Sequence, residues 1–154
     1  TIITGYGVVE DKGEKLWALD WGVIQTATDS LPFKLKKIYK ALEETLEKFK
    51  PNVIAVENIF YAKNVKTALK LGHARGITFL VAANHDIEIV EYTPLEVKQA
   101  VVGYGRAEKQ QVQKMVPFLL GLNNSLISTD ASDALAVAIC HIHSYKWNHS
   151  CKVI

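Results

Sequence analysis

The run NVIAVE, residues 52–57, places the strongest constraint on what this chain can fold into. It is almost continuously apolar and ends in the acidic residue Glu57. A strand with one solvated face alternates between apolar and polar residues, whereas an unbroken apolar run is typical of a central strand covered on both faces. In an α/β fold, helices on each side of the sheet supply this cover, so the segment fits an α/β fold.

The segments around this run support the same fold class. TGYGVVE and KLWALDWGVIQT are rich in β-forming residues, and the turn-prone EDKGE between them predicts a hairpin. Apolar residues at helical spacing predict a helix that ends before Pro51: Leu35, Ile38, Tyr39, Leu42, Leu46 and Phe49. We then expect a helix from about Asn64 to Ala83, the strand IEIVEYT, a short helix after Pro94, the loop VGYGRAE, a helix from about Lys109 to Leu120, and a closing helix after Asp130. Early strands followed by alternating helices and strands predict a mixed sheet.

Length and composition restrict the class of protein. A chain of 154 residues that is 49% apolar can bury one core, so we expect a single domain over residues 1–154. The formal charge of +2 does not by itself indicate a nucleic-acid partner. Cys140 and Cys151 lack CxxC spacing, which argues against a zinc finger or disulfide framework and fits a reducing cytosol. Without a membrane-length apolar run or a signal peptide, we expect a cytoplasmic protein.

Three carboxylates are the main candidates for chemistry. Glu57 ends a buried strand, where an ionised group is costly unless it is paired or bound to a cation. Asp130 and Asp133, in STDASDALAVAICHIH, are three residues apart and can share a helix face. Each has an ordinary explanation, since Asp is a good N-cap residue and a Glu at a frayed strand end is simply solvated. If the three converge, however, their hard oxygen ligands suit Mg²⁺, as in two-metal nucleases.

Basic residues are concentrated in one predicted helix. Four of them and no acid lie between residues 61 and 80: Lys63, Lys66, Lys70 and Arg75. The lysines at i, i+3 and i+7 share a face that could follow a phosphate backbone, although an ordinary solvated face fits equally well. The opposite face is apolar with small residues, suited to the core or to a close helix partner: Val65, Ala68, Leu69 and Gly72.

The histidines near the end of the chain do not predict a zinc site. His141 and His143 are two residues apart and point in different directions on a helix, while His149 and Cys151 are expected in a frayed tail. We interpret the helical histidines as favourable cations at a helix C-terminus.

Four blocks of sequence, TGYGVVE, VIAVENIFYAKNVKTALKLGHARG, VKQAVVGYGRAEKQQVQKMV and DASDALAVAIC, resemble in order and spacing the bacterial RuvC Holliday-junction resolvases of the RNase H-like superfamily. The resemblance covers nearly the whole chain. It implies an RNase H-like fold, with a mixed five-stranded sheet flanked by helices. It also implies a homodimer that cuts four-way DNA junctions by two symmetric nicks with Mg²⁺ or Mn²⁺. A branch-migration helicase complex of the RuvA and RuvB type is the implied protein partner.

The resemblance also assigns roles to individual residues. Glu57 corresponds to the family's central-strand catalytic Glu, and Asp130 and Asp133 to its two C-terminal catalytic Asp residues. Phe60, a core aromatic by packing arguments alone, matches a Phe implicated in base contacts. Lys98 and Lys109, otherwise ordinary exposed lysines, align with lysines required for activity. The implied DNA-binding residues are Phe60, Lys63, Lys98, Arg106 and Lys109.

The chain opens on TIITGYG, and family members carry a first-strand Asp just ahead of the position of Thr1. We therefore expect a truncated first strand and a fourth carboxylate outside these residues. A molecule lacking that Asp should bind junctions and cleave little. This leaves two alternatives to a resolvase: a catalytically impaired junction-binding protein of the same fold, and an RNase H-like nuclease acting on flaps or RNA/DNA hybrids.

Overall fold

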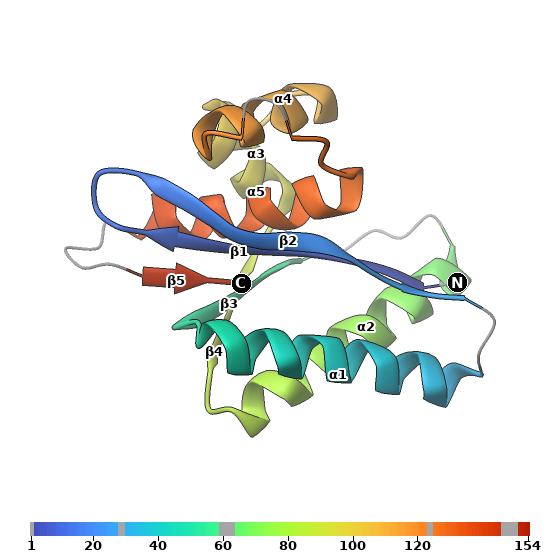
Figure 1. Ribbon diagram of the computed structural model, residues 1–154. Helices are drawn as coiled ribbons and strands as arrows, with labels where there is room; N and C mark the ends of the chain where they lie inside the picture. The colour runs from blue at the N-terminus through green and yellow to red at the C-terminus, as the bar shows by residue number, and fades with distance from the viewer. Residues whose placement is uncertain (1, 28–29, 59–63, 123–124, 146–150) are drawn as a thin grey trace.

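Five strands form one mixed sheet (Figure 1). The computed structural model describes residues 2–27, 30–58, 64–122, 125–145 and 151–154. The strands are β1 (Ile2–Asp11), β2 (Leu16–Thr26), β3 (Val53–Glu57), β4 (Glu88–Tyr92) and β5 (Cys151–Val153), in the order β2-β1-β5-β3-β4. β1 is antiparallel to β2 and β5, whereas β3 is parallel to β4 and β5. The predicted hairpin and mixed sheet are confirmed.

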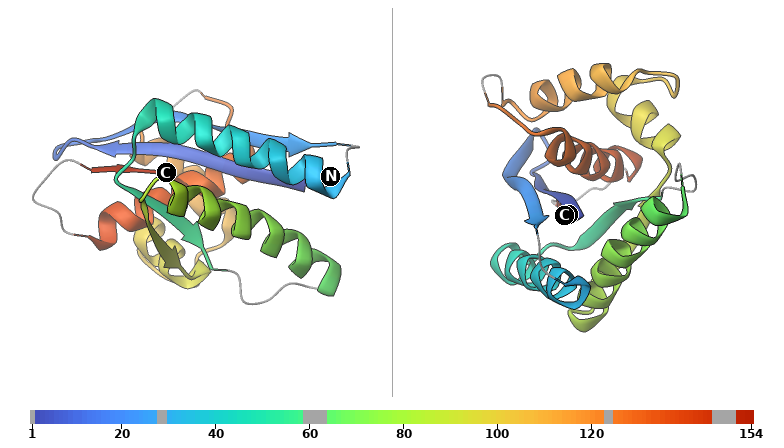
Figure 2. Two further views of the ribbon diagram at one scale, coloured as in Figure 1. Left: turned by 90° about the horizontal axis from the view of Figure 1, so that it is seen from below. Right: turned by 90° about the vertical axis from the view of Figure 1, so that its right-hand side faces the viewer.

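Helices cover both faces of the sheet, as the run NVIAVE predicted. They are α1 (Leu31–Phe49), α2 (Val65–Asn84), α3 (Pro94–Val102), α4 (Lys109–Leu119) and α5 (Thr129–Ser144). α1 and α2 pack on one face and α3, α4 and α5 on the other (Figure 2). Val8 and Val9 are both fully buried, because neighbouring residues of a strand point into opposite cores. The predicted end of the first helix before Pro51 is confirmed, with Lys50 as a left-handed C-cap.

The expectation of a frayed C-terminal tail at Cys151 is wrong, while His149 lies outside the described residues. Cys151–Val153 forms β5, and Val153 is fully buried between Val9 of β1 and Val53 of β3. The segment gains backbone hydrogen bonds in the middle of the sheet, and Val153 and Ile154 gain burial, which together outweigh the tendency of chain ends to fray.

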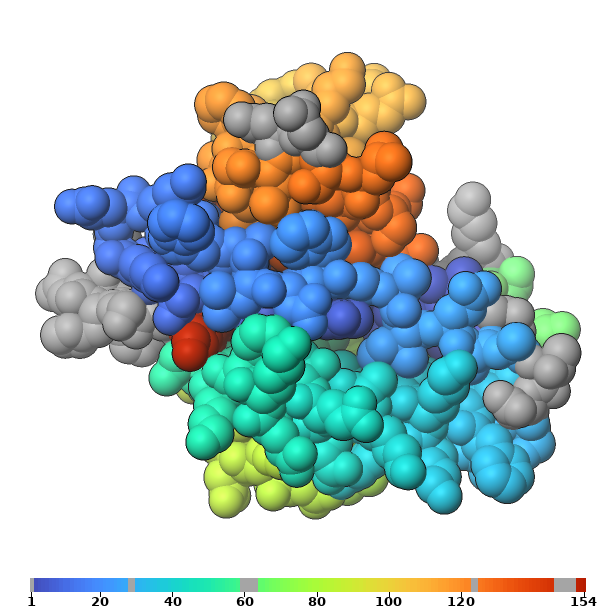
Figure 3. Space-filling model, viewed as in Figure 1, coloured from blue at the N-terminus to red at the C-terminus, as the bar shows by residue number. Residues whose placement is uncertain are grey.

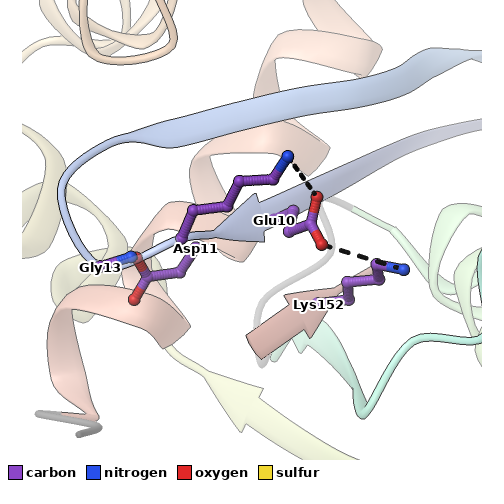
Figure 4. Close-up of polar contacts among 5 residues, drawn as sticks. Glu10, Asp11, Gly13 and Lys152 are labelled. Carbon is purple, nitrogen blue, oxygen red and sulfur yellow. Dashed lines mark hydrogen bonds and ion pairs between the residues drawn. The ribbon is translucent and has the colours of Figure 1, made fainter. Parts of the chain in front are cut away.

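Ion pairs around β1 hold the same region. Glu10 lies 3.6 Å from the Lys12 ammonium and 3.9 Å from that of Lys152 on β5 (Figure 4). In the adjoining turn, the backbone N–H of Gly13 donates to Asp11 Oδ1 at 2.8 Å. Ion pairs near the surface contribute little to the free energy of unfolding. These contacts therefore help to orient the end of β1 and β5 and add little stability.

β5 joins two half-sheets that otherwise do not pair with each other in the described strands. It pairs with residues 9–11 of β1 and with Val53 at the start of β3. The surface view shows the β1–β2 hairpin as a band between α1 and the helices α4 and α5 (Figure 3). Beyond β5, the N-terminal half of β1 and the C-terminal half of β3 lie on either side of an open pocket.

Candidate active site

The pocket beyond β5 has a volume of about 510 Å³ and contains all three predicted carboxylates. Glu57 comes from β3, and Asp130 and Asp133 come from the start of α5. Strand β1 and helix α2 complete its walls. Residues more than 70 positions apart are therefore brought to one place, at the carboxyl end of β3, where α/β sheets commonly bind their ligands.

Glu57 is held by the parallel pairing of β3 and β4. It is the last residue of β3 and lies beside Tyr92, whose carbonyl accepts a 2.7 Å hydrogen bond from the N–H of Asn58. Burial, and then the neighbouring charge of Asp133, raises the pKa of Glu57, while Lys109 and Lys98 lower it. The pocket thus crowds negative charge where its hydration is reduced, and a cation there would relieve that repulsion.

The closing helix, expected after Asp130, begins one residue before it, and Asp130 is an acid of its first turn and not its N-cap. The N-cap is Ser128, whose Oγ accepts a hydrogen bond from the N–H of Ala131 at 3.3 Å, and the helix begins at Thr129. Asp130 lies in the first turn. Because the serine satisfies a free backbone donor, the aspartate side chain stays available to the pocket.

Two glycines of β1 allow α5 to lie directly against the strand. A Cβ on Gly5 would lie 2.0 Å from the backbone oxygen of Asp130, and one on Gly7 would lie 2.6 Å from Leu135 Cδ2. Sequence reasoning missed this close packing. The signal was the pair of glycines two residues apart, since such residues share one face of a strand and mark a close approach.

The predicted basic residues separate into different environments. The Lys109 ammonium lies 2.7 Å from Asp133 Oδ2, and Lys98 is close enough to act electrostatically on Glu57. Arg106 is exposed, with no ion pair among the residues that the structure describes. Phe60 and Lys63 lie outside the described residues, so their predicted roles stay predictions.

Arg75 does not share the surroundings of the exposed Lys66 and Lys70 of α2. Its guanidinium donates to Asn58 Oδ1 at 3.3 Å and pairs with Glu91 of β4. Asn58 and Arg75 both line the pocket and were missed as site residues from the sequence. Their contact ties α2 to the strand end that carries Glu57, which nothing in the local sequence indicates.

The predicted apolar face of α2 is exposed and not part of the core: Val65, Ala68, Leu69 and Gly72. The side chains of Val65 and Leu69 are 76% and 58% exposed. Of the two interpretations, core or helix partner, the first is wrong and the second stays a prediction.

The interpretation of both helical histidines as C-terminal cations is wrong for His141. This side chain is buried, Nδ1 shares a 2.8 Å hydrogen bond with the Tyr92 hydroxyl, and burial lowers the pKa of the ring. A buried imidazole avoids charge because hydration is lost, so packing overrides the helix dipole. His143 is exposed, with Nδ1 2.9 Å from the carbonyl oxygen of Ala100.

The donor set of the pocket fits a hard divalent cation. No three His, Cys, Asp or Glu side chains in the described parts of the chain are already gathered closely enough to enclose an ion. The side chains of Glu57, Asp130 and Asp133 nevertheless supply only carboxylate oxygens, the ligands that Mg²⁺ prefers, and Asp133 already pairs with an ammonium group.

Among the helices that the structure describes, none is long and apolar enough to cross a membrane.

A five-stranded mixed sheet with helices on both faces is the RNase H-like fold of solved RuvC structures. The fold matches "Thermus thermophilus RuvC structure" with a TM-score of 0.86 and 31% identity, over 98% of this chain and 93% of that one. It also matches "T. thermophilus RuvC in complex with Holliday junction substrate" with a TM-score of 0.87 and 28% identity, over 99% of each chain.

The family model for crossover junction endodeoxyribonuclease RuvC matches residues 1–141, and the chain belongs to this family. The RuvC of Alkaliphilus oremlandii is 49% identical over 98% of this chain and 93% of its own length. The RuvC of Syntrophotalea carbinolica is 53% identical over 96% of this chain and 92% of its own length.

Proposed function

We propose that this protein resolves four-way DNA junctions by paired symmetric nicks during homologous recombination and DNA repair. The observation that carries the proposal is the convergence of Glu57, Asp130 and Asp133 in one pocket of a RuvC-family chain. The complex of the Thermus thermophilus RuvC with a Holliday junction supports junction DNA as the substrate.

Glu57, Asp130 and Asp133 are the residues that would hold the metal, which we propose is a pair of Mg²⁺ ions, with Mn²⁺ as a substitute. When bound, such ions supply an activated water and neutralise charge on the attacking and leaving oxygens. Lys109 and Lys98 lower the pKa of Glu57 and so oppose the effect of burial and of Asp133. The same two ammonium groups would stabilise the negative charge that develops on a phosphate bound in the pocket.

The DNA path that we propose runs across the pocket and includes Lys98, Arg106 and Lys109, with Phe60 and Lys63 on the segment that follows β3. Arg106 is exposed and follows the turn at Gly103, whose φ of 99° favours glycine. Phosphate contacts of this kind position DNA without reading its sequence.

We further propose that residues 1–154 form one nuclease domain that acts as a cytoplasmic homodimer with a branch-migration complex of the RuvA and RuvB type. A dimer places two sites about a twofold axis, which matches the near-twofold symmetry of a four-way junction. The exposed apolar face of α2 supports self-association there.

The central test is cleavage of a four-way junction with Mg²⁺, beside plain duplex, a flap and an RNA/DNA hybrid. The wild-type protein should nick only the junction, in symmetric pairs, and Asp133→Asn should lose this activity. Asp86→Asn is the matched control, because Asp86 is exposed at the end of α2 and Asn tolerates its φ of 53°. Junction binding without nicks by the wild type would support the impaired junction-binding alternative. Equal cutting of flap or hybrid would support the other nuclease.

The dimer has its own test in Leu69→Glu, which places a charge on the exposed face of α2. We expect the variant to sediment as a monomer while its thermal unfolding is unchanged. Leu126→Glu is the control, because Leu126 is also exposed but lies outside α2. A dimer that survives Leu69→Glu would move the interface away from this helix.

A further inference from the structure

Lys109 already forms an ion pair with one of the carboxylates that would hold the metal. It is the first residue of α4, and its ammonium lies 2.7 Å from Asp133 Oδ2. Among the residues that the structure describes, it is the one cation within ion-pair distance of Glu57, Asp130 or Asp133. The side chains of Lys109 and Asp133 are 60% and 37% exposed, so the contact is open to exchange with solvent and ions.

An ammonium group beside a carboxylate weakens the binding of a divalent cation there, because the two positive charges repel each other and share the same negative charge. The ammonium is a compact charge with three donors and no lone pair, so it cannot become a ligand and is repelled by a neighbouring ion. If Asp133 ligates a metal, repulsion from that ion weakens the Lys109–Asp133 pair. Lys109 sits on an exposed helix start, which leaves its long side chain free to turn outward.

We infer that Lys109 is a resident counter-ion that competes with the divalent cation for Asp133 and is released toward the DNA phosphate when the cation binds. The inference rests on the proposed function. It gives one side chain two successive partners, a carboxylate in the metal-free site and a phosphate in the loaded site.

Thermodynamic linkage makes this competition reciprocal. If the ion pair weakens metal binding by some factor, metal binding weakens the ion pair by the same factor. Removal of the ammonium should therefore have two opposite effects, tighter metal binding and slower cleavage. A lysine that acted only on DNA would show the second effect without the first.

The first experiment measures Mn²⁺ binding in the absence of DNA, by electron paramagnetic resonance of the free ion. Lys109→Met should bind Mn²⁺ about fivefold more tightly than the wild type, the upper range for loss of one exposed ion pair. Lys114→Met is the matched control, because Lys114 is exposed on the same helix and forms no ion pair within the described residues. It should change the affinity less than twofold. Lys109→Arg keeps a paired cation and should stay near the wild-type value.

A second experiment follows the release of Lys109 in the wild-type protein. Chemical acetylation, read by mass spectrometry, should become about threefold faster at Lys109 when Mn²⁺ is added. Lys114 is the internal control, because it is exposed on the same helix and forms no ion pair within the described residues. Its acetylation rate should not change.

The outcomes separate this inference from the proposed function. Unchanged or weaker Mn²⁺ binding by Lys109→Met, with a normal wild-type site, would overturn the inference alone and leave the nuclease proposal standing. Absence of Mn²⁺ binding by both proteins would overturn the inference together with the proposed metal mechanism. Because Lys109 is exposed, unchanged thermal unfolding of the variant is expected and verifies that the comparison is fair.

Discussion

Helices α5 and α2 line the same pocket, yet α5 is mostly buried and α2 is largely exposed. Ten residues of α5 are buried, while only Val81 and Ala82 are buried in α2. Both helices are rich in apolar residues, so composition does not explain the difference. α5 packs against β1, β3 and α3, and this packing fixes the backbone that carries Asp130 and Asp133. The contrast separates a helix that positions two of the candidate carboxylates from one that offers an exposed surface.

The largest expected effect comes from removing a core side chain of α5. Leu135 is fully buried, so Leu135→Ala should lower the free energy of unfolding by about 2–5 kcal/mol through lost burial and a cavity. Leu69→Ala on α2, where the side chain is 58% exposed, should change monomer stability by less than about 0.5 kcal/mol. Urea denaturation measures both. Equal losses of unfolding free energy at the two positions would contradict the difference in burial between α5 and α2.

The next effect tests how tightly α5 is seated on β1. A methyl group at Gly5 would meet the Asp130 backbone, which cannot move without shifting the helix start. Gly5→Ala should cost about 1–3 kcal/mol, as overpacking does, and should reduce junction cleavage because Asp130 is displaced. Denaturation and a cleavage assay would be used together. Full activity in a stable Gly5→Ala protein would contradict the close packing.

A buried ring in α5 should make stability depend on pH. Burial lowers the pKa of His141, so the folded protein keeps the ring neutral, while the unfolded chain takes up a proton below about pH 6.5. Unfolding then binds a proton, and stability should fall as the pH drops below that value, by at most about 1.4 kcal/mol per pH unit. Denaturation midpoints at pH 8 and pH 5 measure this. His141→Gln should lose this component, whereas His143→Gln, at an exposed position, should keep it.

The smallest expected effect has the opposite sign and lies on α2. A Cβ at Gly76 would meet nothing within 4 Å, and glycine is a poor helix former. Gly76→Ala should therefore stabilise the monomer by about 0.5–1 kcal/mol in urea denaturation. If α2 forms a close helix contact in a dimer, sedimentation should show weaker association for the same variant. A destabilised monomer would indicate that this face is less open than the structure shows.

The sequence predicted those parts of the fold that depend on local signals. The end of α1 before Pro51 and the end of β3 at Glu57 follow from patterns a few residues long. β5 could not be predicted this way, because Val153 becomes buried only beside partners far along the chain, Val9 and Val53. For the same reason the buried state of His141 was missed, since HIH in a last helical turn looks solvated until Tyr92 is placed against it.

The candidate site was predictable to a similar degree. The three carboxylates stood out because a buried acidic residue is costly and because the resemblance marked the same positions. The contacts around them were not visible. The contact of Lys109 with Asp133 joins residues 24 positions apart in the chain, and that of Arg75 with Asn58 joins residues 17 positions apart. Both contacts depend on helix packing that no local pattern specifies.

The position of β5 also has a consequence for how the protein reaches its native state. Val9 and Val153 are neighbours in the sheet although 144 positions separate them in the chain. Closing so long a loop is entropically slow, and topologies dominated by distant pairings fold slowly. The β1–β2 hairpin and the β3–β4 unit can each form earlier, but they can share one sheet only when β5 arrives between them. Assembly of the pocket, which lies just beyond this strand, should therefore be among the last steps of folding.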